Sequence, residues 1–135
     1  MPVFQRLKNL IRNELTPGAC RETSAPTLIL QDSGDWRDLL ERSNERPVVV
    51  FKHSTSCGIS HEVLKEFQEF VSRNEPIAYG IVNVIEDRRL SDTIAAEMGI
   101  RHASPQAIVI QNEQPVWHAS HWSIMGDELE KAVLR

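Results

Sequence analysis

Apolar and polar residues alternate in short blocks along the chain, and the spacing within the blocks switches repeatedly between two periods. Unbroken apolar runs rich in β-branched residues are typical of strands buried on both faces, whereas apolar residues three or four positions apart are typical of helices with one buried side. Strands are therefore expected at 27–30, 47–51, 77–85, 107–110 and 115–117, and helices around 36–40, 63–71, 90–98 and 125–133.

Short polar segments mark the ends of these elements. Asp32 or Ser33 can cap the first of these helices, and Gly99 stands where the third would turn left-handed. The polar stretch 112–114 separates the last two strands and predicts a hairpin. The resulting order, βαβαβα followed by ββα, requires crossover connections and a central sheet covered by helices, which is an α/β sandwich.

Residues 1–22 precede this alternation and have a different character. Their apolar residues recur at helical spacing, with four basic and two acidic side chains among them, so they predict an amphipathic helix. Thr16-Pro17-Gly18 ends this pattern and begins a polar stretch that runs to Pro26. We therefore expect an N-terminal extension, 1–22, followed by one domain, 23–135. The extension either packs on that domain or docks on a partner or a membrane surface.

Length and charge narrow the classes of protein to consider. The chain has 135 residues, of which 41% are hydrophobic, and this suits one compact domain with its own core. Its formal net charge of -4 provides no broad positive field for a phosphate backbone, so no nucleic-acid partner is expected. No apolar run approaches the roughly 20 residues of a membrane span, and Arg6, Lys8 and Arg12 interrupt the N-terminus where a signal peptide has its apolar block. We therefore expect a cytoplasmic protein that is not inserted in a membrane.

The chain contains two cysteines, Cys20 and Cys57, which form neither a Cys-x-x-Cys pair nor a spacing typical of zinc sites. This usage fits a reducing compartment better than a disulfide-bonded secreted protein. Cys20 falls in the polar stretch after the extension and is interpreted as a surface thiol. Cys57 lies in the segment FKHSTSCGIS, residues 51–60, between a predicted strand and a predicted helix.

The position of Cys57 favours a reactive thiol. If the helix begins near Cys57, the sulfur lies close to free backbone N–H groups and the positive end of the helix dipole, which stabilise the thiolate that attacks disulfides. Ser60, one turn later, offers a hydroxyl but cannot form a disulfide, so a second, external thiol must complete any exchange. A buried, inert cysteine is the alternative. The polar residues around Cys57 argue against burial, because an apolar pocket would leave their polar groups unsatisfied.

Five histidines are candidates for a supporting role. His53, four residues before Cys57, either lends positive charge to the thiolate, moves its proton, or is simply satisfied at the strand end. His61 could join Cys57 as a metal ligand, but two ligands alone make no zinc site, so no metal is expected. The remaining three are interpreted as surface or packing residues: His102, His118 and His121.

Three segments together resemble one known family. They are FKHSTSCGIS at 51–60, GIRHASPQ at 99–106 and WHASH at 117–121, and they resemble the YtxJ-type monothiol bacilliredoxins. The resemblance covers residues 25–135. It implies a thioredoxin-like three-layer sandwich with helices on both faces of a central mixed sheet. Ser104-Pro105-Gln106 then occupies the place of the loop whose cis-proline faces the active cysteine.

For function, the resemblance implies a thiol-disulfide oxidoreductase. Cys57 would remove bacillithiol from mixed disulfides on client proteins. Bacillithiol would be a co-substrate, no cofactor would be tightly bound, and a second low-molecular-weight thiol would release Cys57. The residues expected to shape the binding surface are His53, Ser54, Thr55, Ser56, Gly58, Ile59, Ser60, Ser104, Pro105 and Gln106.

Departures from related motifs leave alternatives open. The family usually has proline after the cysteine, where this chain has Gly58, and Cys-Gly-Ile-Ser also resembles the Cys-Gly-Phe-Ser of monothiol glutaredoxins, which use glutathione and can hold an iron-sulfur cluster. The Gly-Gly-x-Asp with which glutaredoxins hold glutathione is missing, and residues 112–114 stand there instead. Phe51 replaces the acidic residue that thioredoxins bury six positions before the first cysteine. A glutathione-linked protein, a cluster carrier and a non-catalytic interaction module therefore remain alternatives.

Overall fold

The computed structural model describes residues 27–73, 77–124 and 127–133. The expected N-terminal helix, Cys20 and the boundary between residues 22 and 23 lie outside the described residues, so they stay predictions. The described elements, in chain order, are β1 (Thr27–Ile29), α2 (Ser33–Arg42), β2 (Val48–His53), α3 (Gly58–Arg73), β3 (Tyr79–Asn83), α4 (Arg88–Met98), β4 (Gln106–Gln111), β5 (Gln114–Ser120), a short 3-10 helix η2 (His121–Ile124) and α5 (Asp127–Val133).

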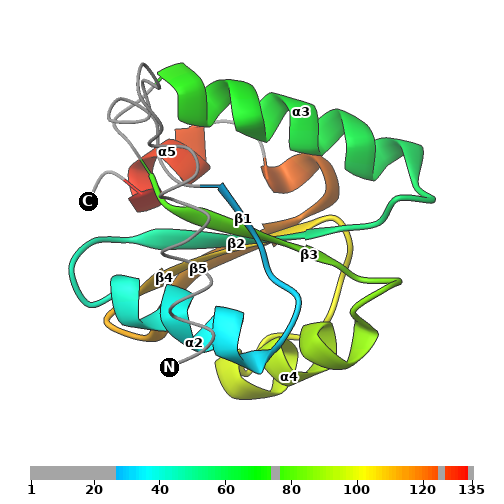
Figure 1. Cartoon of the computed structure of the whole chain (residues 1–135). Helices are drawn as coiled ribbons and strands as arrows, with labels where there is room; N and C mark the ends of the chain where they lie inside the picture. Colours follow the sequence, from blue (N-terminus) through cyan, green and yellow to red (C-terminus); the bar gives the residue numbers. More distant parts are fainter. Residues whose placement is uncertain (1–26, 74–76, 125–126, 134–135) are drawn as a thin grey trace, which may run out of the picture.

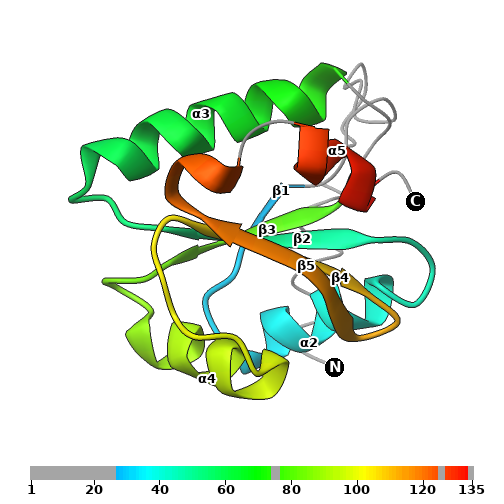
Figure 2. The ribbon, with the colours of Figure 1, turned by 180° about the vertical axis from the view of Figure 1, so that it is seen from behind.

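The five described strands form one mixed sheet in the order β1-β3-β2-β4-β5. β3 pairs in parallel with both β1 and β2, whereas β4 pairs antiparallel with β2 and with β5. Figure 1 and, from the opposite side, Figure 2 show α3 and α5 on one face of the sheet and α2 and α4 on the other. The expected α/β sandwich, with three layers and a mixed central sheet, is thus confirmed.

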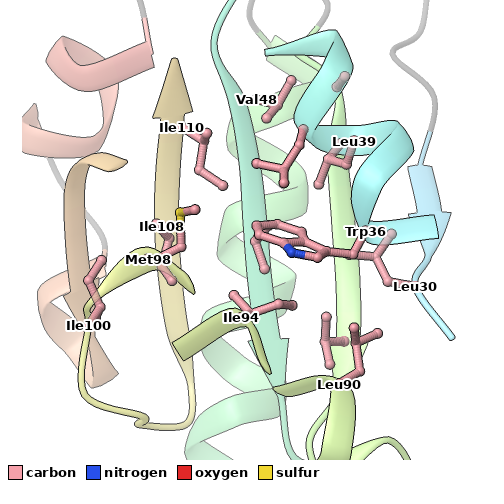
Figure 3. Close-up of a cluster of buried hydrophobic side chains, with 14 residues drawn as sticks. Leu30, Trp36, Leu39, Val48, Leu90, Ile94, Met98, Ile100, Ile108 and Ile110 are labelled. Atoms are coloured by element: carbon pink, nitrogen blue, oxygen red, sulfur yellow. The ribbon is translucent and has the colours of Figure 1, made fainter. Parts of the chain in front are cut away.

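Successive residues of β2 point to opposite faces, so the sheet separates two hydrophobic clusters. Val48 and Val50 belong to the cluster beneath α2 and α4, which contains Trp36 and is drawn in Figure 3. Val49 and Phe51 belong to the cluster beneath α3 and α5. All four of these β2 residues are fully buried, which explains why the strand reads as an unbroken apolar run.

The element ends are capped much as the sequence indicates. The side chain of Asp32 accepts a hydrogen bond of 2.9 Å from the backbone N–H of Asp35 and so caps α2. Gly99 ends α4 with a φ of 67°, in the left-handed region. The turn between β4 and β5 contains only Asn112 and Glu113, with φ of 54° and 64°. Two consecutive left-handed residues suit a tight hairpin, because their twist matches that of the strands they join.

Two differences from the expected elements concern the candidate site. β2 extends two residues beyond Phe51, because Lys52 and His53 still pair with β3. The sequence does not predict η2, since four residues show too little periodicity to identify a helix. Because β2 ends at His53, only three residues separate the end of this strand from Cys57.

Candidate active site

Cys57 connects the carboxyl end of β2 to the amino end of α3. Its backbone N–H donates to the carbonyl of Ser54 at 3.3 Å, and its own carbonyl accepts from the N–H of His61 at 3.2 Å. The second bond makes Cys57 the N-cap residue of α3. It is a free cysteine with a partly exposed side chain. A thiol at this position lies close to the backbone N–H groups of the first helical turn.

Ser60, in the first turn of α3, holds two groups at the end of β2. Its Oγ lies 2.7 Å from Nδ1 of His53 and accepts from the backbone N–H of Ser54 at 2.9 Å. Ser60 is completely buried. A hydroxyl has a single proton, so a hydroxyl that donates to His53 cannot also donate to the sulfur of Cys57. Ser60 therefore fastens the helix to the strand, and its side chain is covered from solvent.

His53 and His61 lie on opposite sides of Cys57 in the chain and pack together. Their rings meet edge to face with centroids 4.8 Å apart, and Nε2 of His61 lies 3.1 Å from the carbonyl oxygen of Thr55. Burial, and after it the nearby His61, lower the pKa of His53. The neutral imidazole is thus favoured, which weakens the hypothesis that His53 supplies positive charge to the thiolate. Proton transfer by His53 stays a prediction.

The other predicted residues of the turn differ in exposure. Ser54 is buried, with its Oγ 3.2 Å from that of Ser56. No heavy atom outside the local backbone lies within 4 Å of the position that a Cβ on Gly58 would take. Exposed members of this group are Thr55, Ser56, Gly58 and Ile59, the last with 39% of the residue's surface accessible. These four form the solvent-facing side of the turn, where an incoming molecule can contact them.

The segment that leads from α4 to β4 carries the second half of the site. Its Ser104–Pro105 peptide bond is cis, as the resemblance implies. β4 starts at Gln106, which pairs with Lys52 near the end of β2. Because these two strands are antiparallel, the chain leaves the sheet for Cys57 at the same edge at which it enters from Pro105. Both views of the ribbon show the two connections at this edge (Figures 1 and 2).

Hydrogen bonds hold this segment on both sides. The carbonyl of Pro105 accepts from the N–H of His121 at 2.9 Å, which joins the segment to η2. Nε2 of Gln106 donates to the carbonyl of Arg101 at 3.0 Å. Among the described residues, Ser104 Oγ and Gln106 Oε1 are buried without a hydrogen-bond partner. Gln106 is only 2% exposed, so its side chain supports the segment from within, and the expected contact of this side chain with a substrate is not supported.

Lys52 lies near the site and is fully buried, and it was not predicted from the sequence. Its Nζ donates to the carbonyl of Ser91 at 3.0 Å and lies 3.4 Å from Nδ1 of His102. Desolvation by burial lowers the pKa of Lys52 to about 8, and attraction to Asp92 opposes part of this effect. A lysine directly after four apolar strand residues is the signal that could have revealed it, since charged side chains seldom occupy a strand covered on both faces.

Within 27–73, 77–124 and 127–133, no three histidine, cysteine or acidic side chains come together as metal ligands. In the same ranges, no helix combines the length and the hydropathy needed to cross a bilayer.

Comparisons with known proteins agree with this architecture. A model of the family described as monothiol bacilliredoxin BrxC matches residues 29–129. A solved structure, described provisionally as an oxidoreductase with a thioredoxin fold, is 29% identical, with a TM-score of 0.72 over 78% of this chain and 92% of that chain. A thioredoxin from Schistosoma mansoni is 26% identical, with a TM-score of 0.63 over 83% of this chain and 94% of its own. A thioredoxin from Fasciola hepatica is 16% identical, with a TM-score of 0.66 over 80% of this chain and 97% of its own.

Proposed function

Because this chain belongs to the monothiol bacilliredoxin BrxC family, we propose that it removes bacillithiol from mixed disulfides on other proteins by thiol-disulfide exchange at Cys57. The observation that carries the proposal is one free, partly exposed cysteine at the N-cap of α3, at the same edge of the sheet as the cis Ser104–Pro105 bond. Such a thiol is accessible to a disulfide, and its thiolate is the attacking species in exchange. A free thiol of this kind fits a reducing compartment, so the proposed location is the cytoplasm.

The proposed reaction has two exchange steps. First, the Cys57 thiolate attacks the bacillithiol sulfur of the mixed disulfide. The bond between bacillithiol and the client breaks, the client leaves as a thiolate, and Cys57 carries bacillithiol. Second, the thiolate of another low-molecular-weight thiol attacks that same bacillithiol sulfur, which releases Cys57 as a thiolate and forms a disulfide between the two small molecules. Across the two steps, the client thiol is reduced and the second small thiol is oxidised, while the bacillithiol sulfur passes from one disulfide to another.

The surroundings of Cys57 support a reaction that uses a single thiol of this protein. The position at which a Cys-x-x-Cys motif would place its second sulfur is Ser60, and that hydroxyl is buried against His53 and Ser54. A disulfide within the motif cannot form, so a thiol from outside the motif has to release bacillithiol from Cys57. The backbone next to the cis Ser104–Pro105 bond is the proposed support for the incoming disulfide.

The test uses the full chain and two disulfides in parallel, oxidised bacillithiol and oxidised glutathione. After incubation, intact mass and peptide mapping identify the adduct and the modified residue. We expect the mass of one bacillithiol on Cys57, formed in clear preference to glutathione. Equal labelling by both would overturn the assignment of bacillithiol and favour a glutathione-linked protein.

Two cysteine variants are the matched controls. Cys57→Ser should form no adduct, whereas Cys20→Ser should label as the unchanged protein does. If Cys20→Ser instead accumulates a persistent mixed disulfide, Cys20 is a resolving thiol and the scheme with one protein thiol is wrong. Visible absorbance after anaerobic purification would favour a cluster carrier, and no labelling by either disulfide would favour an interaction module.

A further inference from the structure

Lys52 lies in the middle strand of the sheet, and its side chain is completely buried on the face that α4 covers. Taking an ammonium out of water costs several kcal/mol, and replacing buried charged groups by apolar side chains of similar volume is often neutral or even stabilising. Attraction to Asp92 offsets only part of the desolvation of Lys52. Stability alone therefore gives little reason for a lysine at this position, and its contacts suggest another reason.

Two polar contacts join Lys52 to α4 and to the segment before β4, and a third joins α4 to that segment. Its Nζ donates to the carbonyl of Ser91, near the start of α4, at 3.0 Å and lies 3.4 Å from Nδ1 of His102. The hydroxyl of Ser91 lies 3.2 Å from the same ring nitrogen. An ammonium has only donors, so Nδ1 of His102 is the acceptor and the ring proton is on Nε2. Partial desolvation of the His102 ring, followed by the charge of Lys52, lowers the pKa of His102, in agreement with a neutral ring.

A second anchor lies beside the first. Gln106 is the cross-strand partner of Lys52, so both side chains stand on the same face of the sheet. Gln106 donates to the carbonyl of Arg101, the residue before His102. Lys52 and Gln106 thus attach the beginning of the segment 101–106 to the sheet. The cis Ser104–Pro105 bond lies between these attachments and β4.

We propose that Lys52 is a positioning residue for the exchange reaction. Through His102 it fixes the segment 101–106, so that the backbone around Ser104 and Pro105 faces the disulfide that docks at Cys57. The docking of a disulfide beside this segment rests on the proposed function, whereas the attachment of the segment to Lys52 does not. Lys52 touches neither the sulfur nor the substrate, and its effect passes through the segment.

Lys52→Met tests this proposal, because it replaces the amine by apolar atoms of similar reach and leaves no buried group without a partner. The carbonyl of Ser91 lies inside a helix, where it also accepts the N–H four residues on. His102 is exposed to water. The melting temperature of Lys52→Met should therefore equal or exceed that of the unchanged protein.

The kinetic readout compares two reagents at Cys57. Transfer of bacillithiol from oxidised bacillithiol should slow roughly ten- to a hundred-fold in Lys52→Met, because a small displacement of a docking group costs this much in rate. Alkylation by iodoacetamide, a small reagent that does not need the segment, should change less than about two-fold, since the thiolate fraction at the helix end is untouched. Equal slowing of both reactions, or no slowing of either, would overturn the proposal.

A second single variant, His102→Leu, keeps the proposal testable if Lys52→Met folds poorly. His102→Leu changes an exposed side chain and should reproduce the same pattern. The double variant Lys52→Met/His102→Leu should be no slower than either single variant, because both remove one contact. Lys131→Met, a change at a lysine whose side chain is 71% exposed on α5, is the matched control and should transfer bacillithiol at the unchanged rate.

Hydrogen exchange separates a failure of this inference from a failure of the proposed function. In Lys52→Met, amides in 101–106 should exchange faster, while those in 115–120 of β5 should not change. If exchange in 101–106 is unaltered, the anchoring is wrong whatever the enzyme does. If exchange rises but the unchanged protein accepts no bacillithiol at all, the anchoring stands and the proposed function falls.

Discussion

At the scale of single residues, the site depends on which groups near Cys57 are already engaged. The hydroxyl of Ser60 is held by His53 and the backbone of Ser54, so the exchange chemistry falls on the one sulfur. Gly58 is the opposite case. It is the first residue of α3, it is exposed, and open space surrounds the position of a Cβ.

Gly58→Pro should stabilise the protein. The first position of a helix favours proline, because its fixed φ suits the helix and its missing N–H has no helical partner to lose. The gain should be about 0.4–1 kcal/mol in the free energy of unfolding, mainly from a less flexible unfolded chain. Urea titration measures it. Gly99→Ala is the contrasting control: with φ of 67° at that residue, it should destabilise by about 1–2 kcal/mol. A loss of stability in Gly58→Pro would show that residue 58 needs a freedom that proline removes.

At the scale of elements, β3 has to lie very close to the chain that follows β1. Gly80 pairs with Leu28 of β1, and a Cβ on Gly80 would lie 2.8 Å from Cγ of Leu30. Leu30 is completely buried, and its N–H donates to the carbonyl of Ile81 at 2.9 Å. The absence of a side chain at Gly80 therefore allows Leu30 to enter the cluster beneath α2 and α4.

Gly80→Ala should lower the free energy of unfolding by about 1–3 kcal/mol, because the added methyl group forces Leu30 out of its packed position. Leu30→Ala alone should cost about 2–5 kcal/mol through the cavity it leaves. The double variant should lose clearly less than the sum of the two, since the space vacated by Leu30 accepts the new methyl group. Strictly additive losses in urea titrations would exclude a direct clash between these two positions.

The extent to which the sequence predicts the site differs between its halves. The half that contains Cys57 is local: an apolar run, a polar turn and a helical stripe follow one another within 47–71, so spacing alone indicates the strand-to-helix junction. The contact between Lys52 and His102 joins residues 50 positions apart. This contact depends on the pairing of β2 with β4 and on where α4 lies over the sheet. No local sequence pattern predicts either of these. η2 is missed for a simpler reason, its length of four residues.

At the scale of the whole molecule, one buried amine couples stability to pH. The pKa of Lys52 is about 8 in the folded protein, against 10.5 for an unperturbed lysine. The folded state thus binds this proton more weakly than the unfolded state, and the cost of burying the charge is fully present below pH 8. It is relieved as the pH rises from 8 to 10.5, so this group alone makes stability rise with pH in that window.

Comparison of Lys52→Met with the unchanged protein isolates this effect. The variant should be the more stable of the two at pH 7, and its advantage should shrink from pH 8 and vanish near 10.5. Urea titrations of both proteins at several pH values measure the difference, and groups that titrate alike in both cancel. An advantage that stays constant across the window would show that the buried amine keeps its ordinary proton affinity.

The division of the interior by the sheet has a consequence for how such a protein can change over generations. α3, which begins just after Cys57, packs on the cluster that contains Phe51 and Phe67, whereas the segment 101–106 depends on Lys52 and on α4 across the sheet. The two halves meet at the edge where β2 ends and β4 begins. Under the proposed function, inherited substitutions in one cluster would therefore alter how fast the sulfur reacts, and those in the other would alter which disulfides are accepted. Selection would then adjust the reaction rate and the choice of client one at a time.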